Sequence, residues 1–284
     1  MKASPSCKSC IESCIRDQYF AFSHLYNDEK PMDMHIHDCY EIYFSISGGK
    51  QFLIDNSFYS ILPGDIFFIN QYESHYLAQI DRQIHERIIF SIYPDFLKSL
   101  STPKTDLETC FHDRSVKFGH KVSLSQEDQK KFLYFVHKLS DIGEYGQDIT
   151  ERAVFSEMMV FLNNRFEKRT PSGEENNISP DARVDQILSY VNQHIAEPLS
   201  TEVLAAQFYL SSSYISRLFK AATGTTIGKY ITAKRITKAK ELLAEGYTVS
   251  EASIACGFQD YSSFFRAFTK ATGVPPKKYA QFSH

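Results

Sequence analysis

The sequence predicts an α+β chain with two domains: a β-barrel or sandwich followed by a pair of helices, and then an all-helical domain. Three observations predict this organisation. Residues 18–98 alternate apolar and polar side chains, residues after about 181 carry apolar side chains at helical spacing, and a polar stretch separates the two. With 284 residues and 43% apolar composition, the chain is long enough for more than one hydrophobic core.

The N-terminal strands are short and closely spaced. In YEIYFSIS the apolar residues Tyr40, Ile42, Phe44 and Ile46 fall on one face, and QFLI, SFYSIL and DIFFIN repeat the alternation between the turn sequences SGG, DNS and PGD. Strands of this length and spacing are typical of a small sandwich or barrel. Residues 124–166 change to helical spacing, which predicts two amphipathic helices packed as an antiparallel pair.

A polar, turn-rich stretch, EKRTPSGEENNISPD, occupies residues 167–181. We therefore predict a first domain over residues 1–170, a linker over 171–182 and a second domain over 183–284. The two parts differ in charge: residues 1–180 carry 19 basic and 26 acidic side chains, and residues 181–284 carry 12 and 8. Ser212–Lys240 alone holds seven cations and no acid, which fits a polyanion partner, and by charge alone it fits an ordinary solvated helix face equally well.

Composition excludes several classes of protein. No apolar run approaches the ~18 residues that a membrane-spanning helix needs, and the start MKASPSCKSCIESCIRD lacks the apolar segment of a signal peptide. We expect a cytoplasmic protein with no membrane partner. Six cysteines do not make a disulfide framework in a chain of this length.

The C-terminal domain contains an internal repeat. With an offset of 49 residues, RLFKAATGTTIGKY (Arg217–Tyr230) aligns with RAFTKATGVPPKKY (Arg266–Tyr279) at seven of fourteen positions. A short helix and a turn precede each copy, so we predict two helix-turn-helix units. Ile227–Gly246 should be one helix of about five turns, 25–30 Å long, ending at the glycine.

Two helix-turn-helix units on one rigid rod fit successive major grooves of B-DNA, which recur every ~34 Å on one face. Arg217 and Arg266 occupy matching positions and are expected to contact guanine or phosphate. Phe265 matches Ser216 and suits a thymine methyl group, and lysines including Lys277 and Lys278 suit phosphates. The predicted DNA-binding residues are Ser212, Ser213, Ser216, Arg217, Lys220, Ser262, Ser263, Phe265, Arg266 and Lys270.

These segments resemble the DNA-binding domain of the AraC/XylS family. LSTEVLAAQFYLSSSYISRLFKAATG matches its first unit, RITKAKELL its linker helix, and ACGFQDYSSFFRAFTKATGVPPKKY its second unit. The chain departs from the usual family pattern at Ala252-Ser253 and Pro275-Pro276. The resemblance implies DNA contacts from Ser212–Lys220 and Tyr261–Lys270, a packing role for Arg235, activation of promoters and RNA polymerase as a partner.

The segment HIHDCYEIYFSISG resembles the first motif of the cupin barrel, in which two histidines and a glutamate bind a metal. Because side chains alternate between the two faces of a strand, His35, His37 and Glu41 are expected on one face, with Cys39 beside them. The second cupin motif is incomplete, because LPGD supplies its turn but Phe67 stands where the metal-binding histidine is expected. His75 is the only nearby replacement.

Barrels of this kind, placed before such a DNA-binding pair, usually hold an effector. We therefore favour an effector pocket over a bound metal or simply buried histidines, and expect no cofactor. Aromatic faces with His and Glu suit a small polar ligand such as a sugar. The predicted effector residues are His35, His37, Glu41, Tyr43 and His75, and Tyr40, Phe52, Tyr72 and Tyr76 are further candidates for the lining.

Cys7, Cys10 and Cys14 lie within eight residues and could bind zinc or sense redox state, but a fourth ligand is missing unless His24 or Cys39 folds back. Incidental cysteines in a mobile N-terminus are the favoured interpretation. Cys39, Cys110 and Cys256 are predicted to be small core residues.

The sequence thus predicts an effector-controlled transcription regulator that binds double-stranded DNA as a homodimer and dimerises through residues 124–166. Two alternatives stay open. One is a metal-dependent cupin enzyme with a helical accessory domain, and the other is an architectural DNA-binding protein whose barrel senses nothing.

Overall fold

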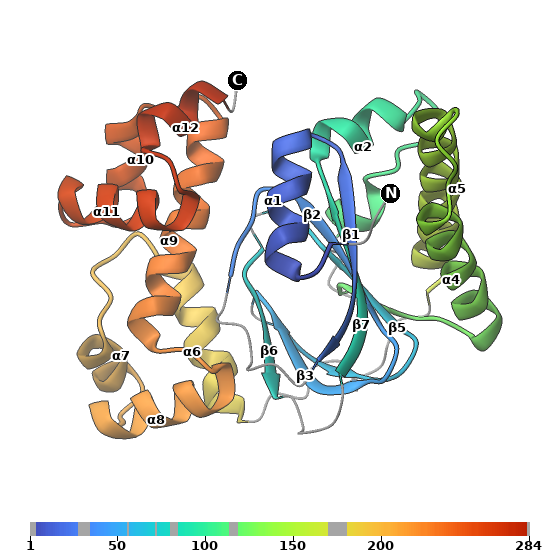
Figure 1. Cartoon of the computed structure of the whole chain (residues 1–284). Helices are drawn as coiled ribbons and strands as arrows, with labels where there is room; N and C mark the ends of the chain where they lie inside the picture. Colours follow the sequence, from blue (N-terminus) through green and yellow to red (C-terminus); the bar gives the residue numbers. More distant parts are fainter. Residues whose placement is uncertain are drawn as a thin grey trace.

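The computed structural model describes residues 4–27, 35–55, 57–71, 73–79, 85–113, 119–169 and 181–282. A barrel of two antiparallel sheets lies between a helical pair on one side and an all-helical domain on the other (Figure 1). The predicted α+β organisation is confirmed. The five-stranded sheet has the order β1 (Phe20–Asn27), β7 (His85–Ile92), β2 (Tyr40–Ser45), β5 (Asp65–Ile69) and β8 (Lys121–Ser123), and the three-stranded sheet has the order β4 (Ser57–Ile61), β3 (Gly49–Ile54) and β6 (His75–Gln79).

Side-chain alternation along β2 divides the first domain into two cores. Tyr40, Ile42 and Phe44 point to the outer face and pack beneath α4 (Gln126–Ser140) and α5 (Gln147–Glu167). Tyr43 points inward and packs with residues of both sheets. The predicted pair of amphipathic helices is therefore present, and it covers the outer face of the large sheet. Two shorter helices, α2 (Pro94–Leu100) and α3 (Thr109–His112), pack against the same outer core.

The N-terminal cysteines lie in a helix that packs on the barrel. α1 (Cys7–Asp17) begins with a capping box between Ser6 and Ser9. Cys10 and Cys14 are fully buried against β1 and Cys39. The interpretation of a mobile segment with incidental cysteines is wrong, because the thiols supply the small apolar surface that seats α1 on the sheet. Cys39, Cys110 and Cys256 are core residues, as predicted.

The second domain is all-helical. Asp181 caps its first helix, so the last two residues assigned to the linker already belong to the start of that helix. The other predicted linker residues, 171–180, lie outside the described residues. The helices are α6 (Ala182–Gln193), α7 (Thr201–Gln207), α8 (Ser212–Thr223), α9 (Ile227–Ala244), α10 (Val249–Ala255), α11 (Tyr261–Thr272) and α12 (Pro276–Phe282).

The predicted rod is α9. Thr226 caps its start, and after the C-cap the chain turns at Gly246, whose φ is +91°. Its 18 residues span about 27 Å at 1.5 Å per residue. α7 and α8 pack at one end of the rod and α10 and α11 at the other (Figure 1). The two helix-turn-helix units are thus held apart by one continuous helix.

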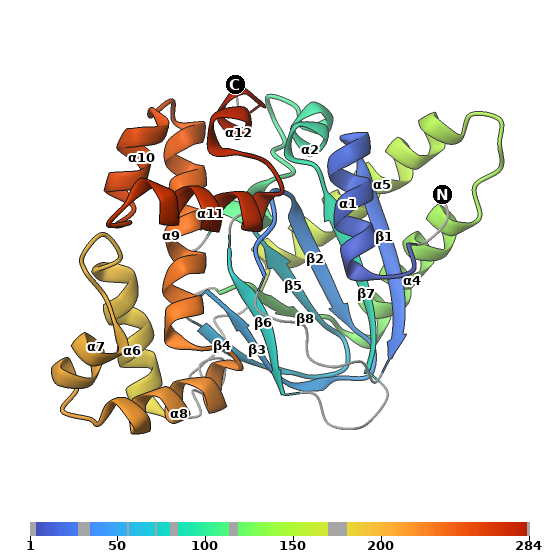
Figure 2. The ribbon, with the colours of Figure 1, turned by 60° about the vertical axis from the view of Figure 1, so that its left-hand side comes forward.

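The second domain covers the outer face of the small sheet. Leu53 on β3 and Phe58 on β4 are direct register partners, and both side chains join the core of the first helix-turn-helix unit. That core includes Phe219 of α8 and Tyr230 of α9. Figure 2 shows α8 and α9 lying against β3, β4 and β6. The two domains therefore share a hydrophobic core in this arrangement.

The repeat offers a matched test of this docking. Gly224 ends α8 and Gly273 ends α11, with φ values of +69° and +75°. A Cβ on Gly224 would overlap the ring of Tyr76 on β6, whereas a Cβ on Gly273 would meet nothing within 4 Å. We predict that Gly273→Ala lowers the free energy of unfolding by about 1–2 kcal/mol through left-handed backbone strain alone. Gly224→Ala should lose a further ~1–3 kcal/mol, because the overlap forces Tyr76 or α8 to move.

Urea unfolding of both variants beside the wild type measures the difference. Equal losses at the two glycines would show that α8 does not pack on β6 in solution.

Candidate DNA-binding surface and effector site

The two candidate recognition helices have the same local construction. Ser211 caps α8 and accepts a hydrogen bond from the Tyr214 amide, and Asp260 caps α11 and accepts one from the Ser263 amide. Each helix ends in a Thr-Gly pair. The Thr223 hydroxyl donates to the Phe219 carbonyl, and the Thr272 hydroxyl donates to the Phe268 carbonyl in the second unit. The 49-residue repeat is therefore a repeat of backbone geometry as well as of residue types.

The predicted DNA-binding residues lie on the surface of these helices. Ile215 and Phe219 of α8, and Phe264 and Phe268 of α11, are fully buried and fix which face of each helix is free. Phe265 keeps 38% of its side chain exposed. The exposed face carries Ser212, Ser213, Ser216, Arg217 and Lys220 on α8 and Ser262, Phe265, Arg266 and Lys270 on α11, with Ser263 half-buried beside them.

Arg217 and Arg266 are exposed, and the charge of Arg266 also interacts with Asp260 at the start of its helix. An exposed guanidinium is available to a phosphate or to a guanine edge. Both arginines therefore meet the chemical requirement that the sequence prediction placed on them.

The count of seven cations in Ser212–Lys240 overestimates the positive charge on the candidate DNA-binding surface. Lys240 is buried at 2% exposure and pairs with Asp38 at 2.5 Å, and Lys234 pairs with Asp55 at 2.8 Å. Both acids belong to the barrel domain. These lysines were counted among the seven cations of Ser212–Lys240. Their ammonium groups are instead paired with carboxylates of the barrel domain.

Arg235 connects α9 to the end of α6. Its guanidinium donates to the Ile195 carbonyl at 3.1 Å and to the Glu197 carbonyl at 2.7 Å, and it lies over the ring of Phe258. Carbonyls that follow a helix lack backbone donors, so this arginine satisfies them. The packing role that the family resemblance implies for Arg235 agrees with these contacts.

The barrel brings four predicted residues together. The donor atoms of His35, His37, Glu41 and His75 all lie within 4.8 Å of one another. His37 Nε2 lies 3.0 Å from Glu41 Oε2, and His75 Nε2 lies 3.7 Å from the same oxygen. His35 reaches the group through a backbone bridge to His75. Phe67 stands where the cupin pattern places a histidine, and it packs inside the barrel. His75 supplies the third imidazole of the cluster instead.

Backbone carbonyls orient two of the imidazoles. His37 Nδ1 lies 2.8 Å from the Cys39 carbonyl oxygen, and His75 Nδ1 lies 3.0 Å from that of Glu73. A carbonyl only accepts, so each Nδ1 carries a hydrogen and donates it. The Nε2 atoms then face the cluster. His75 Nε2 has no hydrogen-bond partner among the described residues, although it is buried.

Burial and charge compete at this cluster. Burial disfavours the charged form of His37, but Cys39 and Glu41 outweigh it and raise the pKa of His37 to about 9. Burial also opposes ionisation of Glu41, yet His75 and His37 hold its pKa well below the usual range. The cluster therefore balances a carboxylate against imidazolium charge among side chains of which three are buried and His35 is half-buried.

These donors fit a transition-metal ion. Three imidazoles and one carboxylate are ligands for zinc and neighbouring divalent metals, and an orphaned buried nitrogen is satisfied by coordination. Hydrogen bonds from Nδ1 to carbonyls are the usual outer-shell support of histidine ligands. Cys39 does not join the set, because its thiol packs with Cys10 and Cys14.

The expected aromatic lining is only partly correct. Tyr43 and Phe52 lie inside the barrel, and the Tyr43 hydroxyl contacts His85 Nε2. Tyr40 is wrong as a lining residue: it points outward, stacks on Phe111 and bonds to Glu108, because it lies one residue from Glu41 on the strand. Tyr76 is also wrong, since it packs against Gly224 of the other domain. Tyr72 lies outside the described residues.

Comparison with known proteins agrees with this architecture. A model described as "AraC-like ligand binding domain" matches residues 18–106, and one described as "Helix-turn-helix domain" matches residues 204–281. The HTH-type transcriptional activator RhaS of Enterobacter is 28% identical over 252 residues, covering 87% of this chain and 87% of the relative. The activator RhaR of Escherichia coli is 23% identical over 278 residues, covering 93% and 95%.

Solved structures of similar proteins include ToxT of Vibrio cholerae with a bound unsaturated fatty acid, at 15% identity and a TM-score of 0.38 over 92% of this chain and 95% of that one. The DNA-binding domain of AdpA, solved in complex with a target DNA, is 25% identical with a TM-score of 0.35 over 36% of this chain and 93% of that one.

A barrel with an effector-type site beside two helix-turn-helix units defines a DNA-binding transcription regulator. The chain belongs to the AraC family. Because this is a family of regulators, the alternative of a cupin enzyme is set aside. No helix among the described residues is long and apolar enough to cross a membrane.

The barrel interior predicts a pH dependence of stability. Burial and the nearby Arg87 lower the pKa of His85 from its ordinary value of 6.5. A base with a lowered folded pKa contributes stability above the unfolded pKa, and this contribution is lost as the pH falls through the folded pKa. We predict that His85→Gln flattens the loss of stability between pH 7 and pH 5. Urea unfolding at each pH measures it, and parallel curves for variant and wild type would contradict the assignment.

Proposed function

We propose that the chain is a DNA-binding transcriptional activator that works in the cytoplasm on promoter DNA. α8 and α11 enter successive major grooves, held at the required separation by α9. The observation that carries this proposal is the pair of exposed arginines, Arg217 and Arg266, at matching positions of a duplicated helix. Relatives named as activators support activation over repression, and RNA polymerase is the partner that activation requires.

The effector site in this proposal is the barrel cluster of His35, His37, Glu41 and His75, with Tyr43 nearby. The sequence favours a hydroxylated ligand such as a sugar, which these donors would bind through hydroxyl groups. Ligand acts by changing the relative stability of two arrangements of the domains, because it shifts an equilibrium only by its difference in affinity.

The arginines supply the test of DNA binding. Arg217→Ala and Arg266→Ala should each weaken binding to a duplex selected from a random library by ~1–3 kcal/mol. If phosphates are contacted, each should also reduce the slope of log affinity against log salt by about one. Fluorescence anisotropy across a salt series measures both quantities.

Lys98→Ala is the matched control, because it removes one exposed cation from α2 of the barrel domain, outside α8 and α11 and outside the proposed dimer interface of α4 and α5. Wild-type affinity in the double arginine variant, with folding unchanged, would end the DNA-binding assignment.

We also propose a homodimer that forms through α4 and α5. The exposed apolar side chains of this helical pair and its loop support the proposal, because a monomer rarely leaves several such groups in water. They are Tyr134, Tyr145, Ile149 and Val160.

The double variant Tyr134→Glu, Val160→Glu should convert a dimer to a monomer in sedimentation velocity, because charge cannot be buried at an apolar interface without cost. Tyr209→Glu, on a still more exposed tyrosine of the DNA-binding domain, is the control. A wild-type monomer at micromolar concentration would refute this interface.

A further inference from the structure

The two candidate recognition helices differ at two matching positions. With the offset of 49 residues, Ser212 and Ser216 of α8 align with Tyr261 and Phe265 of α11. All four side chains are exposed, and the two aromatic residues are 50% and 38% exposed. The arginine that follows the second position is present in both units. The second unit therefore presents aromatic rings where the first presents small hydroxyls.

The two aromatic rings form one apolar surface. Tyr261 and Phe265 are one helical turn apart, and their ring centroids are separated by 6.2 Å with an angle of 40° between the planes. The centroid of the Tyr261 ring also lies 6.0 Å from that of Phe264, which is fully buried. These contacts reduce the side-chain freedom that remains to be lost when a partner covers the rings.

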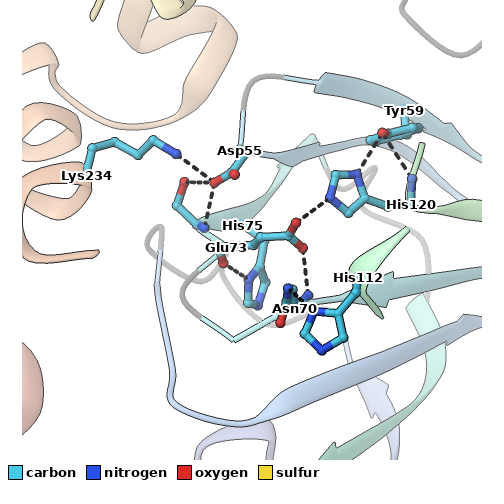
Figure 3. A network of polar contacts seen from close by, with 9 residues as sticks. Asp55, Tyr59, Asn70, Glu73, His75, His112, His120 and Lys234 are labelled. Atoms are coloured by element: carbon cyan, nitrogen blue, oxygen red, sulfur yellow. Dashed lines mark hydrogen bonds and ion pairs between the residues drawn. The ribbon is translucent and has the colours of Figure 1, made fainter. Parts of the chain in front are cut away.

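The barrel domain contacts the second domain at other places. Lys234 of α9 reaches Asp55 at 2.8 Å (Figure 3), and the ring of Tyr76 lies at Gly224, where α8 ends. Both exposed rings of α11 stay in water although the two domains are docked. Adjoining aromatic rings in this situation favour a partner that is not part of the described chain.

The neighbours of the rings indicate which partner this is. Ser262 follows Tyr261 and Arg266 follows Phe265, and both polar side chains are exposed beside the rings. Tyr261 is the first residue of α11, and the first turns of a recognition helix reach base edges in the major groove. The apolar group that base pairs present in this groove is the C5-methyl group of thymine. An exposed guanidinium next to the rings suits the phosphates on either side of such a base.

We propose that Tyr261 and Phe265 make the half-site under α11 selective for thymine through contacts with C5-methyl groups, and that α8, with serines at the same positions, lacks this selectivity. The inference rests on the proposed DNA binding and deepens it by naming the base chemistry that one unit recognises. The two half-sites are then not interchangeable, because only one of them offers the methyl groups that α11 requires. The thymine-bearing half-site fixes the direction in which the chain lies on the duplex.

Uracil substitution tests the methyl contacts, because deoxyuridine differs from thymidine only in lacking the C5-methyl group. The full chain is bound to a duplex selected from a random library, and each thymine is replaced in turn. Loss of a contacted methyl group should weaken wild-type binding about fourfold, as expected for the burial of one methyl-sized group. The sensitive thymines should all lie in one half-site. Fluorescence anisotropy measures each affinity.

The double variant Tyr261→Ser, Phe265→Ser gives α11 the residues of α8, and it should bind the thymine and uracil duplexes equally. Tyr247→Ser is the matched control, because Tyr247 is 47% exposed in the same domain but lies outside α8 and α11. It should keep the wild-type response to uracil. Urea unfolding checks that the double variant is folded, and Phe265→Ser alone gives the same test at one ring if it is not.

Two further results separate a methyl contact from a structural role. Phe265→Leu keeps an apolar side chain and should therefore keep the sensitivity to uracil. Selection from the random library should enrich thymine in one half-site with the wild type. With the double serine variant this enrichment should disappear, while the other half-site keeps its sequence.

Equal wild-type affinity for every thymine and uracil duplex, or an unchanged response to uracil in the double serine variant, overturns the proposal. A change from dimer to monomer in sedimentation velocity of that variant would also overturn it, because the rings would then belong to a protein interface. Failure of the proposed function is distinguishable, since the wild type would then bind no duplex. Failure of this inference alone leaves binding that depends on Arg217 and Arg266 but not on the methyl groups.

Discussion

Alternation of side chains along the barrel strands is the constraint on which the rest of the structure depends. Each strand has an inner and an outer set of apolar residues, and both must be buried. The helices α4 and α5 bury the outer set of the large sheet, and the first helix-turn-helix unit buries Leu53 and Phe58 of the small sheet. The outer face of the small sheet in the barrel domain is thus also part of the hydrophobic core of the DNA-binding domain.

Because of this shared core, the two helix-turn-helix units have different surroundings. α8 and α11 both have side-chain N-caps and glycine ends, yet a Cβ on Gly224 would overlap Tyr76 of the barrel and a Cβ on Gly273 would meet nothing within 4 Å. The barrel therefore packs closely on the end of α8 and leaves the matching glycine of α11 open.

Polar contacts at the same interface are concentrated on α9. Lys240 pairs with Asp38, which follows His37 in the chain, and Lys234 pairs with Asp55, which accepts hydrogen bonds from Ser74, the residue before His75. A lysine buried without a partner is costly, so these contacts specify one position of the rod on the barrel. The histidine cluster, the small sheet and the rod therefore form a continuous structure that reaches α8 and α11.

Features that depend on neighbours in the chain were determined by the sequence alone: the strand alternation, the 49-residue repeat, the length of α9 and the exposed face with Arg217 and Arg266. The sequence also predicted that His35, His37 and Glu41 lie together, although of the three only Glu41 lies in a regular strand. Tertiary structure decided what depends on distant partners. It placed His75 as the fourth donor, buried the α1 cysteines and turned Tyr40 outward with the apolar residues of β2. It also paired Lys234 and Lys240 with carboxylates of the barrel. Local periodicity carries no information about which surface another segment will cover, so these outcomes follow from packing between elements far apart in the chain.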